Sequence, residues 1–345
     1  MAAKLYSMYF ILYLFILSSS IFNYEGCIYD LKTTPQTTNN KVCLIIVDGL
    51  RYDYVPYMEY ISWHIQNDSA VLYKSISGVP SYSRPGYERI LTGSETEING
   101  IHSNNNRILS LIPNIFSLCK NKGLKTSCSA FYWFEELYPF LIDYKYLYFY
   151  NDSLVFKKAE EFVKKYKPEF IVIHPMEVDN AGHRYGAKSS GYINSVKNVD
   201  KNIEKTWDTI KNDGYTLLIT SDHGHRDESG HGDGCSECIN TPFIIISNNI
   251  KNLNLKDNKN IISQIDIAPT ICDFLGISKT IYMTGESLFQ NKNNISEIRS
   301  LFTFYGIKNF KSFFNLTSII TYVIISIYTV IYFSYFIIVI KILNS

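Results

Sequence analysis

Lys41-Val-Cys-Leu-Ile-Ile-Val-Asp-Gly49 is the stretch that decides the fold: a lysine, a run of apolar residues, then an aspartate and a glycine. Such a run is typical of a strand buried on both faces of a parallel sheet, because neither face offers a polar residue to solvent. Residues 169–174, 215–220 and 242–247 have the same character. The sequence therefore predicts several buried strands in one sheet.

Two stretches with apolar residues at helical spacing, residues 153–166 and 189–212, lie between these strands. Strands that alternate with helices indicate an α/β sandwich around a mostly parallel central sheet. Ligands of such sheets bind beyond the carboxyl ends of the strands. The residues that directly follow each apolar run are therefore the first candidates for a functional site.

Metal-ligating side chains gather at these strand ends. They are Asp48, Asp179, His183, Asp222, His223 and His231. Any one of them alone would be an ordinary cap or turn residue, but three Asp and three His form the mixed oxygen and nitrogen set that zinc or manganese accepts. Six ligands suit two ions sharing a site about 4 Å across, as in two-metal phosphoryl transfer. We expect two divalent metal ions, Zn²⁺ or Mn²⁺.

A nucleophile is available in Val79-Pro-Ser-Tyr-Ser-Arg-Pro-Gly86, which precedes a helix-like stretch at residues 87–91. Proline near the start of a helix is favoured, and a hydroxyl there lies at the positive end of the helix, where phosphate binds well. We predict Ser83 as the nucleophile and Ser81 as the second candidate. The alternative is that Ser83 only caps the helix.

Taken together, these segments resemble the alkaline phosphatase superfamily, in its type I phosphodiesterase/nucleotide pyrophosphatase branch. The resemblance covers residues 41–289 and keeps the order of the family's motifs. The matching segments are Ile45-Ile-Val-Asp-Gly49, Pro80-Ser-Tyr-Ser-Arg-Pro-Gly86, Leu91-Thr-Gly93, Asn99-Gly-Ile-His-Ser-Asn104, Val178-Asp-Asn-Ala-Gly-His183, Thr220-Ser-Asp-His-Gly224, Ser229-Gly-His-Gly-Asp-Gly234 and Gln264-Ile-Asp-Ile-Ala-Pro-Thr-Ile271.

The resemblance implies an alkaline-phosphatase-like three-layer sandwich and a distribution of ligands between the two ions. One ion would be held by Asp48, Asp222 and His223 and would also meet the Ser83 oxygen. The other would be held by Asp179, His183 and His231. Asn104 falls where the family places an Asn that steadies a phosphate oxygen.

The expected function is a membrane-anchored phosphodiesterase or nucleotide-pyrophosphatase-type hydrolase that forms a phospho-serine intermediate. Most phosphodiesterase relatives carry Thr at the Ser83 position, whereas the Ser-Arg-Pro-Gly version resembles ethanolamine phosphate transferases that act on glycolipid (GPI) anchors. Those transferases usually have many membrane spans. Phosphomonoester hydrolysis is a further alternative. A catalytically silent ligand-binding ectodomain is disfavoured, because it would have no physical reason to keep six metal ligands.

Both ends of the chain contain long apolar segments without charge, unlike its middle. Lys4 precedes an apolar run, which predicts a signal peptide or an uncleaved signal anchor. No charge occurs between Lys311 and Lys341, which predicts a transmembrane helix or, alternatively, a lipid-anchor signal. The expected segments are a signal peptide or anchor (1–24), a linker (25–40), the catalytic domain (41–290), a juxtamembrane segment (291–312), a transmembrane helix (313–340) and a short tail (341–345).

This organisation predicts a single-pass membrane protein with an extracytosolic catalytic domain. Seven cysteines and the sequons at Asn67, Asn151, Asn294 and Asn315 are compatible with that compartment. A net charge of +1 provides no global field to recruit a nucleic acid polymer. The expected partners are the membrane and a phosphate-ester small molecule or a lipid or glycolipid headgroup.

Overall fold

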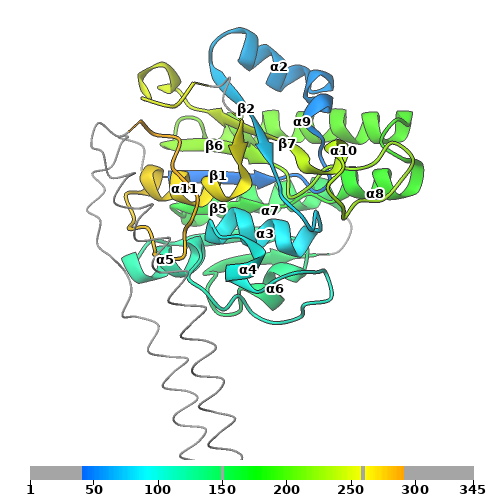
Figure 1. The fold of residues 1–345 in the computed structure, drawn as a ribbon. Helices are drawn as coiled ribbons and strands as arrows, with labels where there is room; N and C mark the ends of the chain where they lie inside the picture. The colour runs from blue at the N-terminus through cyan, green and yellow to red at the C-terminus, as the bar shows by residue number, and fades with distance from the viewer. Residues whose placement is uncertain (1–40, 149–150, 258–260, 291–345) are drawn as a thin grey trace, which may run out of the picture. The chain divides into compact units, whose positions relative to one another are not determined.

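One mixed sheet with helices on both faces organises residues 41–148, 151–257 and 261–290, which a computed structural model describes (Figure 1). The sheet has eight strands in the order β4-β3-β5-β1-β6-β7-β2-β8. Among the described strands, β7 alone runs antiparallel to its neighbours, β6 and β2. The strands are β1 (Lys41–Ile46), β2 (Ala70–Ile76), β3 (Thr126–Ala130), β4 (Tyr144–Leu147), β5 (Phe170–Ile173), β6 (Tyr215–Thr220), β7 (Asn240–Ile246) and β8 (Ile262–Ser263).

Strand β1 lies at the centre and is buried on both faces, as its apolar run predicts. Val42, Leu44 and Ile46 pack into one hydrophobic core, and Cys43 and Ile45 pack into the other. This alternation follows from the period of two along a strand. The prediction of an α/β fold with a mostly parallel sheet is confirmed.

The two cores lie between the sheet and two layers of helices (Figure 1). The first core packs under α3 (Ser83–Thr92), α5 (Ile115–Lys122) and α11 (Ile267–Leu275). The second packs under α2 (Glu59–Gln66), α7 (Asp152–Tyr166) and α9 (Ser190–Ile210). The remaining helices are η2 (Tyr52–Tyr57), α4 (Thr96–Asn99), α6 (Trp133–Leu137), α8 (Glu177–Tyr185), α10 (Ser236–Ile239), η3 (Ile250–Asn252) and η4 (Gln264–Asp266).

The two predicted helices are α7 and α9, and side-chain caps explain where each begins. The Asn151 side chain accepts a hydrogen bond from the backbone of Leu154 at the start of α7, and the Ser189 side chain accepts one from Tyr192 at the start of α9. Each cap satisfies a backbone donor that the first helical turn leaves without a partner. The predicted bounds therefore agree with the observed ones to within two residues.

Parallel pairing brings the ends of the central strands to one edge of the sheet. Strand β1 pairs in parallel with β5 on one side and with β6 on the other. The residues that follow these three strands therefore lie together, and they include Asp48, His174 and Asp222. In Figure 1 the arrow of β1 points to the side of the molecule where α8 and α10 lie.

The predicted signal segment, linker, juxtamembrane segment, transmembrane helix and tail lie outside the described residues. Within the described ranges, no helix is both long and apolar enough to span a membrane.

Glu88 lies within the α3 layer and gives the folded state a pH dependence. Its side chain is fully buried and accepts a hydrogen bond of 2.9 Å from Ser110 Oγ. Burial raises the pKa of Glu88 from 4.5 to about 7, against the lowering effect of Tyr138 and Ser110. The protonated carboxyl therefore stabilises the fold fully below pH 4.5, and this stability is lost as the pH rises toward 7.

We therefore expect Glu88→Gln to raise the melting temperature relative to the wild type at pH 8 but much less at pH 4.5. The difference between the two pKa values corresponds to roughly 3 kcal/mol at the higher pH. Thermal unfolding at the two pH values measures the effect. An equal shift at both pH values would contradict it.

Candidate active site

The six predicted metal ligands lie together at the carboxyl edge of the sheet. Asp179, His183 and His231 form one group whose ligand atoms all lie within 4.8 Å of one another. Asp48, Asp179 and His223 form a second such group, and Asp48 and Asp222 form a third with His174. Asp48 and Asp179 are shared between groups, so the groups are contiguous.

The group of Asp179, His183 and His231 matches one of the two sets that the resemblance implies. His183 Nε2 lies 3.4 Å from Asp179 Oδ2, and His231 Nε2 lies 3.7 Å from Asp179 Oδ1. Asp179 and His183 are one helical turn apart on α8, so their side chains share a face. The Nε2 atoms of His183 and His231 are 3.1 Å apart.

Helix α8 is fixed in place by Asp152, the first residue of α7. One Asp152 oxygen accepts from the backbone of Met176 at 2.8 Å, and the other accepts from Glu177 at 3.0 Å. These bonds satisfy donors at the start of α8, and a carboxylate is favoured at that end of a helix. The position of Asp179 thus depends on a cap from a different helix.

The second set, Asp48, Asp222 and His223, is fully buried. His223 Nε2 lies 3.4 Å from Asp48 Oδ1 and 3.3 Å from Asp222 Oδ2. Asp222 Oδ1 accepts a hydrogen bond from the Gly49 backbone at 3.2 Å. The set therefore brings two carboxylates and one imidazole to the same point, as the resemblance implies.

The hydrogen bonds of His223 and His231 show which ring nitrogen carries the proton and which carries a free lone pair. His223 Nδ1 contacts the Gly224 carbonyl at 2.9 Å, and His231 Nδ1 contacts the Ser81 carbonyl at 2.9 Å. A carbonyl accepts only, so each Nδ1 carries the proton and each Nε2 presents a lone pair. Metal-binding histidines usually have this arrangement.

Three carboxylate oxygens face these lone pairs without any hydrogen-bond donor of their own in the described structure. They are Asp48 Oδ1, Asp179 Oδ1 and Asp222 Oδ2. Acceptors that face one another in a buried site are costly unless a cation lies between them. The donor set therefore fits divalent ions.

The pKa shifts of the three carboxylates also indicate that the site needs a cation. Burial, followed by the charge of Asp48, raises the pKa of Asp179 well above its ordinary value. Burial, followed by Asp48 and Asp179, does the same to the pKa of Asp222. Burial acts upward on Asp48 too, but His174 and His223 hold its pKa below the ordinary range. Like charges this close require compensation.

The two buried imidazoles, His223 and His231, are in the neutral form that binds metals. Burial lowers the pKa of His223 to about 4 and that of His231 to about 3. Both rings are therefore uncharged at neutral pH and need not release a proton to act as ligands.

Ser83 is the first residue of α3, and its hydroxyl faces this cluster. Its Oγ lies 3.1 Å from His223 Nε2. The N-cap position belongs to Tyr82, which makes no side-chain cap, so Ser83 does not cap the helix as the alternative supposed. Gly86 permits the approach, because a Cβ there would lie 2.7 Å from the Cβ and carbonyl of Asp222.

The other two predicted residues of this segment have different surroundings. Asn104 Oδ1 accepts from the Arg84 backbone at 3.0 Å, which places the Asn104 side chain beside the start of α3. Ser81 is fully buried, and its hydroxyl donates to the Asp233 carbonyl at 2.7 Å. Ser81 Oγ thus bonds to another loop, whereas Ser83 Oγ contacts a predicted ligand.

Two features of the site escaped sequence reasoning. Asp48 Oδ2 is held by the Tyr87 hydroxyl at 2.7 Å and by His174 Nε2 at 3.2 Å, which leaves Oδ1 for the cluster. His225 is buried and its Nε2 lies 3.7 Å from Asp179 Oδ1. The position of His174 at a strand end and the spacing of His223 and His225 were the available signals.

Cys235 and Cys238, in the segment that follows His231, are present as two thiols. With Asp233 they form a further group of ligand atoms within 4.8 Å. Asp233 is engaged in an ion pair with Arg226, which competes with a role as a metal ligand.

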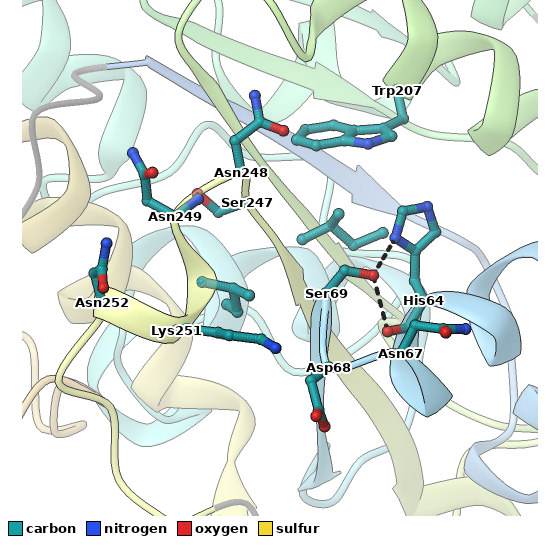
Figure 2. Close-up of a pocket in the computed structure, with 12 residues that line it drawn as sticks. His64, Asn67, Asp68, Ser69, Trp207, Ser247, Asn248, Asn249, Lys251 and Asn252 are labelled. Carbon is teal, nitrogen blue, oxygen red and sulfur yellow. Dashed lines mark hydrogen bonds between the residues drawn. The ribbon is translucent and has the colours of Figure 1, made fainter.

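A cavity of about 490 Å³ lies elsewhere, beside the end of β7 (Figure 2). Its lining includes His64, Ser69 and Trp207. Ile246 at the end of β7 pairs with Leu217 near the start of β6, so this cavity is at the opposite edge of the sheet from Asp222. The Ser69 hydroxyl lies 2.7 Å from His64 Nδ1 and donates to the His64 carbonyl at 3.0 Å, so it bridges the ring and the backbone of His64 (Figure 2).

A family model described as Sulfatase matches residues 40–277. The chain belongs to the sulfatase family, within the alkaline phosphatase superfamily. The predicted resemblance to the superfamily is therefore confirmed.

Two kinds of curated relative are similar to this chain. The human GPI ethanolamine phosphate transferase 2, catalytic subunit, is 21% identical over 76% of this chain and 29% of its own length. A 2,3-bisphosphoglycerate-independent phosphoglycerate mutase from Antithamnion is 38% identical over 37% of this chain and 25% of its own length. The chain thus spans less than a third of either relative.

Solved structures show the same fold. Murine ectonucleotide pyrophosphatase/phosphodiesterase 5 has a TM-score of 0.58 at 14% identity, over 76% of this chain and 99% of that chain. The C-terminal periplasmic domain of EptC from Escherichia coli has a TM-score of 0.57 at 14% identity, over 74% and 88%. The two curated relatives are named as a transferase and a mutase, and with the family match they confirm the prediction that this chain is an enzyme.

We expect the purified wild-type protein to carry close to two divalent ions per chain by elemental analysis. His231→Ala should lose about one ion while keeping its circular dichroism spectrum, because His231 lies outside both hydrophobic cores. Chelation should abolish activity, and zinc or manganese should restore it. A wild-type protein that is fully active without bound metal would contradict the prediction.

Proposed function

We propose that this chain is a two-metal phosphoryl-transfer enzyme that uses Ser83 as its nucleophile and acts as a phosphodiesterase or nucleotide-pyrophosphatase-type hydrolase. The observation that supports it best is the contact of Ser83 Oγ with His223 Nε2 at 3.1 Å, at the start of α3. That contact places a hydroxyl between the buried ligand cluster and the amino end of a helix, where phosphate oxygens are stabilised.

Each residue of the site has a separate role in the proposed reaction. Ser83 loses its hydroxyl proton to solvent, attacks phosphorus and displaces the alcohol leaving group of the ester, which gives a phospho-serine. Water or an acceptor alcohol then attacks that phosphorus, breaks its bond to Ser83 and restores the serine hydroxyl. Asn104, whose side chain lies beside the start of α3, would donate its amide to a phosphate oxygen as charge builds there. The two ions, Zn²⁺ or Mn²⁺ when bound, would lower the pKa of coordinated hydroxyls and neutralise phosphoryl charge. Asp48, Asp222 and His223 would hold one ion.

Asp179, His183 and His231 would hold the other ion. These side chains come from α8 and from the loop of residues 229–234, and His183 is the most exposed of the three. Half of the His183 side chain is exposed, at 49%, whereas Asp48 and Asp222 are fully buried. The exposed position suits a route by which a phosphate ester enters.

Transfer of ethanolamine phosphate to a glycolipid is the second candidate. The relatives named GPI ethanolamine phosphate transferase favour it, since the human protein matches 76% of this chain. Both reactions share the nucleophile and the ions, and they differ in the acceptor that receives the phosphoryl group.

The proposal extends to location: the catalytic domain faces the extracytosolic side of a membrane and is anchored by residues 313–340. That segment carries no charge and is rich in apolar residues, which supports the proposed anchor. The sequon residues Asn67 and Asn151 are both exposed in the structure, as an acceptor of glycan must be.

Ser83→Ala should reduce turnover by several powers of ten while retaining both metal ions, because only the attacking oxygen is lost. Ser83→Thr should keep much of the activity. A panel of phosphate diester, monoester and pyrophosphate substrates, assayed with added zinc, identifies the substrate class.

Trapping with a slow substrate followed by peptide mass spectrometry locates the phosphorylated residue. Phosphate on Ser81, or wild-type activity in Ser83→Ala, would overturn the assignment. Transfer to an added glycolipid in place of water would establish the second candidate.

Protease added to sealed cells should remove the catalytic domain and leave a cytosolic marker intact. Permeabilised cells, in which both are degraded, provide the control. Protection of the domain in sealed cells would show that the proposed orientation is wrong.

A further inference from the structure

Ser81 makes four hydrogen bonds to the loop that carries His231. Its hydroxyl donates to the Asp233 carbonyl at 2.7 Å and accepts from the Gly232 backbone at 3.0 Å. The Ser81 backbone N–H donates to the Gly232 carbonyl at 3.3 Å, and the Ser81 carbonyl accepts from His231 Nδ1 at 2.9 Å. Every polar group of Ser81 is therefore engaged with residues 231–233.

These bonds fix both the backbone around His231 and the orientation of its ring. The bond from Nδ1 to the Ser81 carbonyl sets the tautomer and directs Nε2 toward Asp179. Ser81 is fully buried, so water does not compete for its hydroxyl. Gly232 has a φ of +124° and packs against the Tyr82 ring, where a Cβ would lie 2.4 Å from Tyr82 Cε1, so the loop fits closely against residues 81–82.

The same short segment also carries the proposed nucleophile. Ser81 bonds to the loop of His231, Tyr82 packs against Gly232, and Ser83 begins α3 beside His223. The segment thus contacts a member of each group of ligands, His231 through Ser81 and His223 through Ser83.

We propose that Ser81 is a positioning residue that holds His231 in place as a metal ligand and thereby sets the second ion relative to Ser83. This inference rests on the proposed two-ion site. It assigns the second serine of the motif a role that is distinct from nucleophilic attack.

Ser81→Ala removes the hydroxyl and leaves the backbone bond to His231 available. Because the loop then loses two of its bonds, we expect the retained zinc to fall from about two ions per chain to about one after dialysis. In a chelator competition, the affinity for the weaker ion should fall by about 10-fold or more, the range typical of residues that orient a ligand. Ser81→Thr, which keeps the hydroxyl, should retain most of that affinity.

Ser77 provides a matched control. It is a fully buried serine four residues away, and within the described structure its Oγ has no hydrogen-bond partner. Ser77→Ala should therefore retain both ions with wild-type affinity. Equal losses in the Ser77 and Ser81 variants would show a general effect of cavity formation and would overturn the proposal.

A double-mutant comparison tests whether Ser81 acts through His231. The variant with both Ser81→Ala and His231→Ala should retain as much zinc as His231→Ala alone, because the two changes remove the same ligand. Additive losses would contradict this route. If Ser81→Ala fails to fold, Gly232→Ala disturbs the same loop from the other side and should also lose one ion.

Failure of the role proposed for Ser81 can be distinguished from failure of the proposed function. A wild-type protein that binds two ions, together with a folded Ser81→Ala variant that binds both with wild-type affinity, would overturn the role of Ser81 alone. A wild-type protein that is active without metal would overturn the proposed function.

Discussion

Three carboxylates, Asp48, Asp179 and Asp222, meet at the carboxyl edge of the sheet with almost no access to solvent. Their mutual repulsion in a buried site is the constraint on which the rest of the site depends, because ionised groups at this distance need a cation between them. The surrounding contacts are consistent with this constraint. Tyr87 and His174 occupy one oxygen of Asp48, and burial lowers the pKa of His223 and His231 so that both rings are neutral. The atoms that still face the centre of the site are therefore lone-pair donors to a metal ion: one oxygen of each carboxylate and the Nε2 atoms of His223 and His231.

The fold supplies the rigidity that such a site requires. Strand β1 is buried on both faces, and β5 and β6 flank it in parallel, so the ends of these strands cannot shift independently of the two cores. Helix α3 approaches Asp222 closely through Gly86, and α8 is held by the cap from Asp152. Side chains that are mounted on strands and helices in this way keep their geometry better than side chains on loops.

The sequence predicted the central strands and the long helices because each has a strong periodic signal or an uninterrupted apolar run. It did not predict β4, a short strand of four residues, Tyr144–Leu147, none of which is buried. The six candidate ligands were found from their positions after strands and from the family resemblance, which set their division into two groups. The position of His174 after a strand was visible in the sequence. The contacts of His174 and Tyr87 with Asp48 were not predicted, since they depend on packing between α3 and the end of β5.

The candidate ligands are contributed by segments far apart in the chain, from Asp48 after the first described strand to His231 beyond β6. A growing chain that has reached only α9 therefore offers no complete set for either ion. Zinc or manganese would be acquired late in biosynthesis, after most of the domain has folded, and from whatever supply the surrounding compartment provides. Metal availability in that compartment would then limit how much of the newly made protein becomes active.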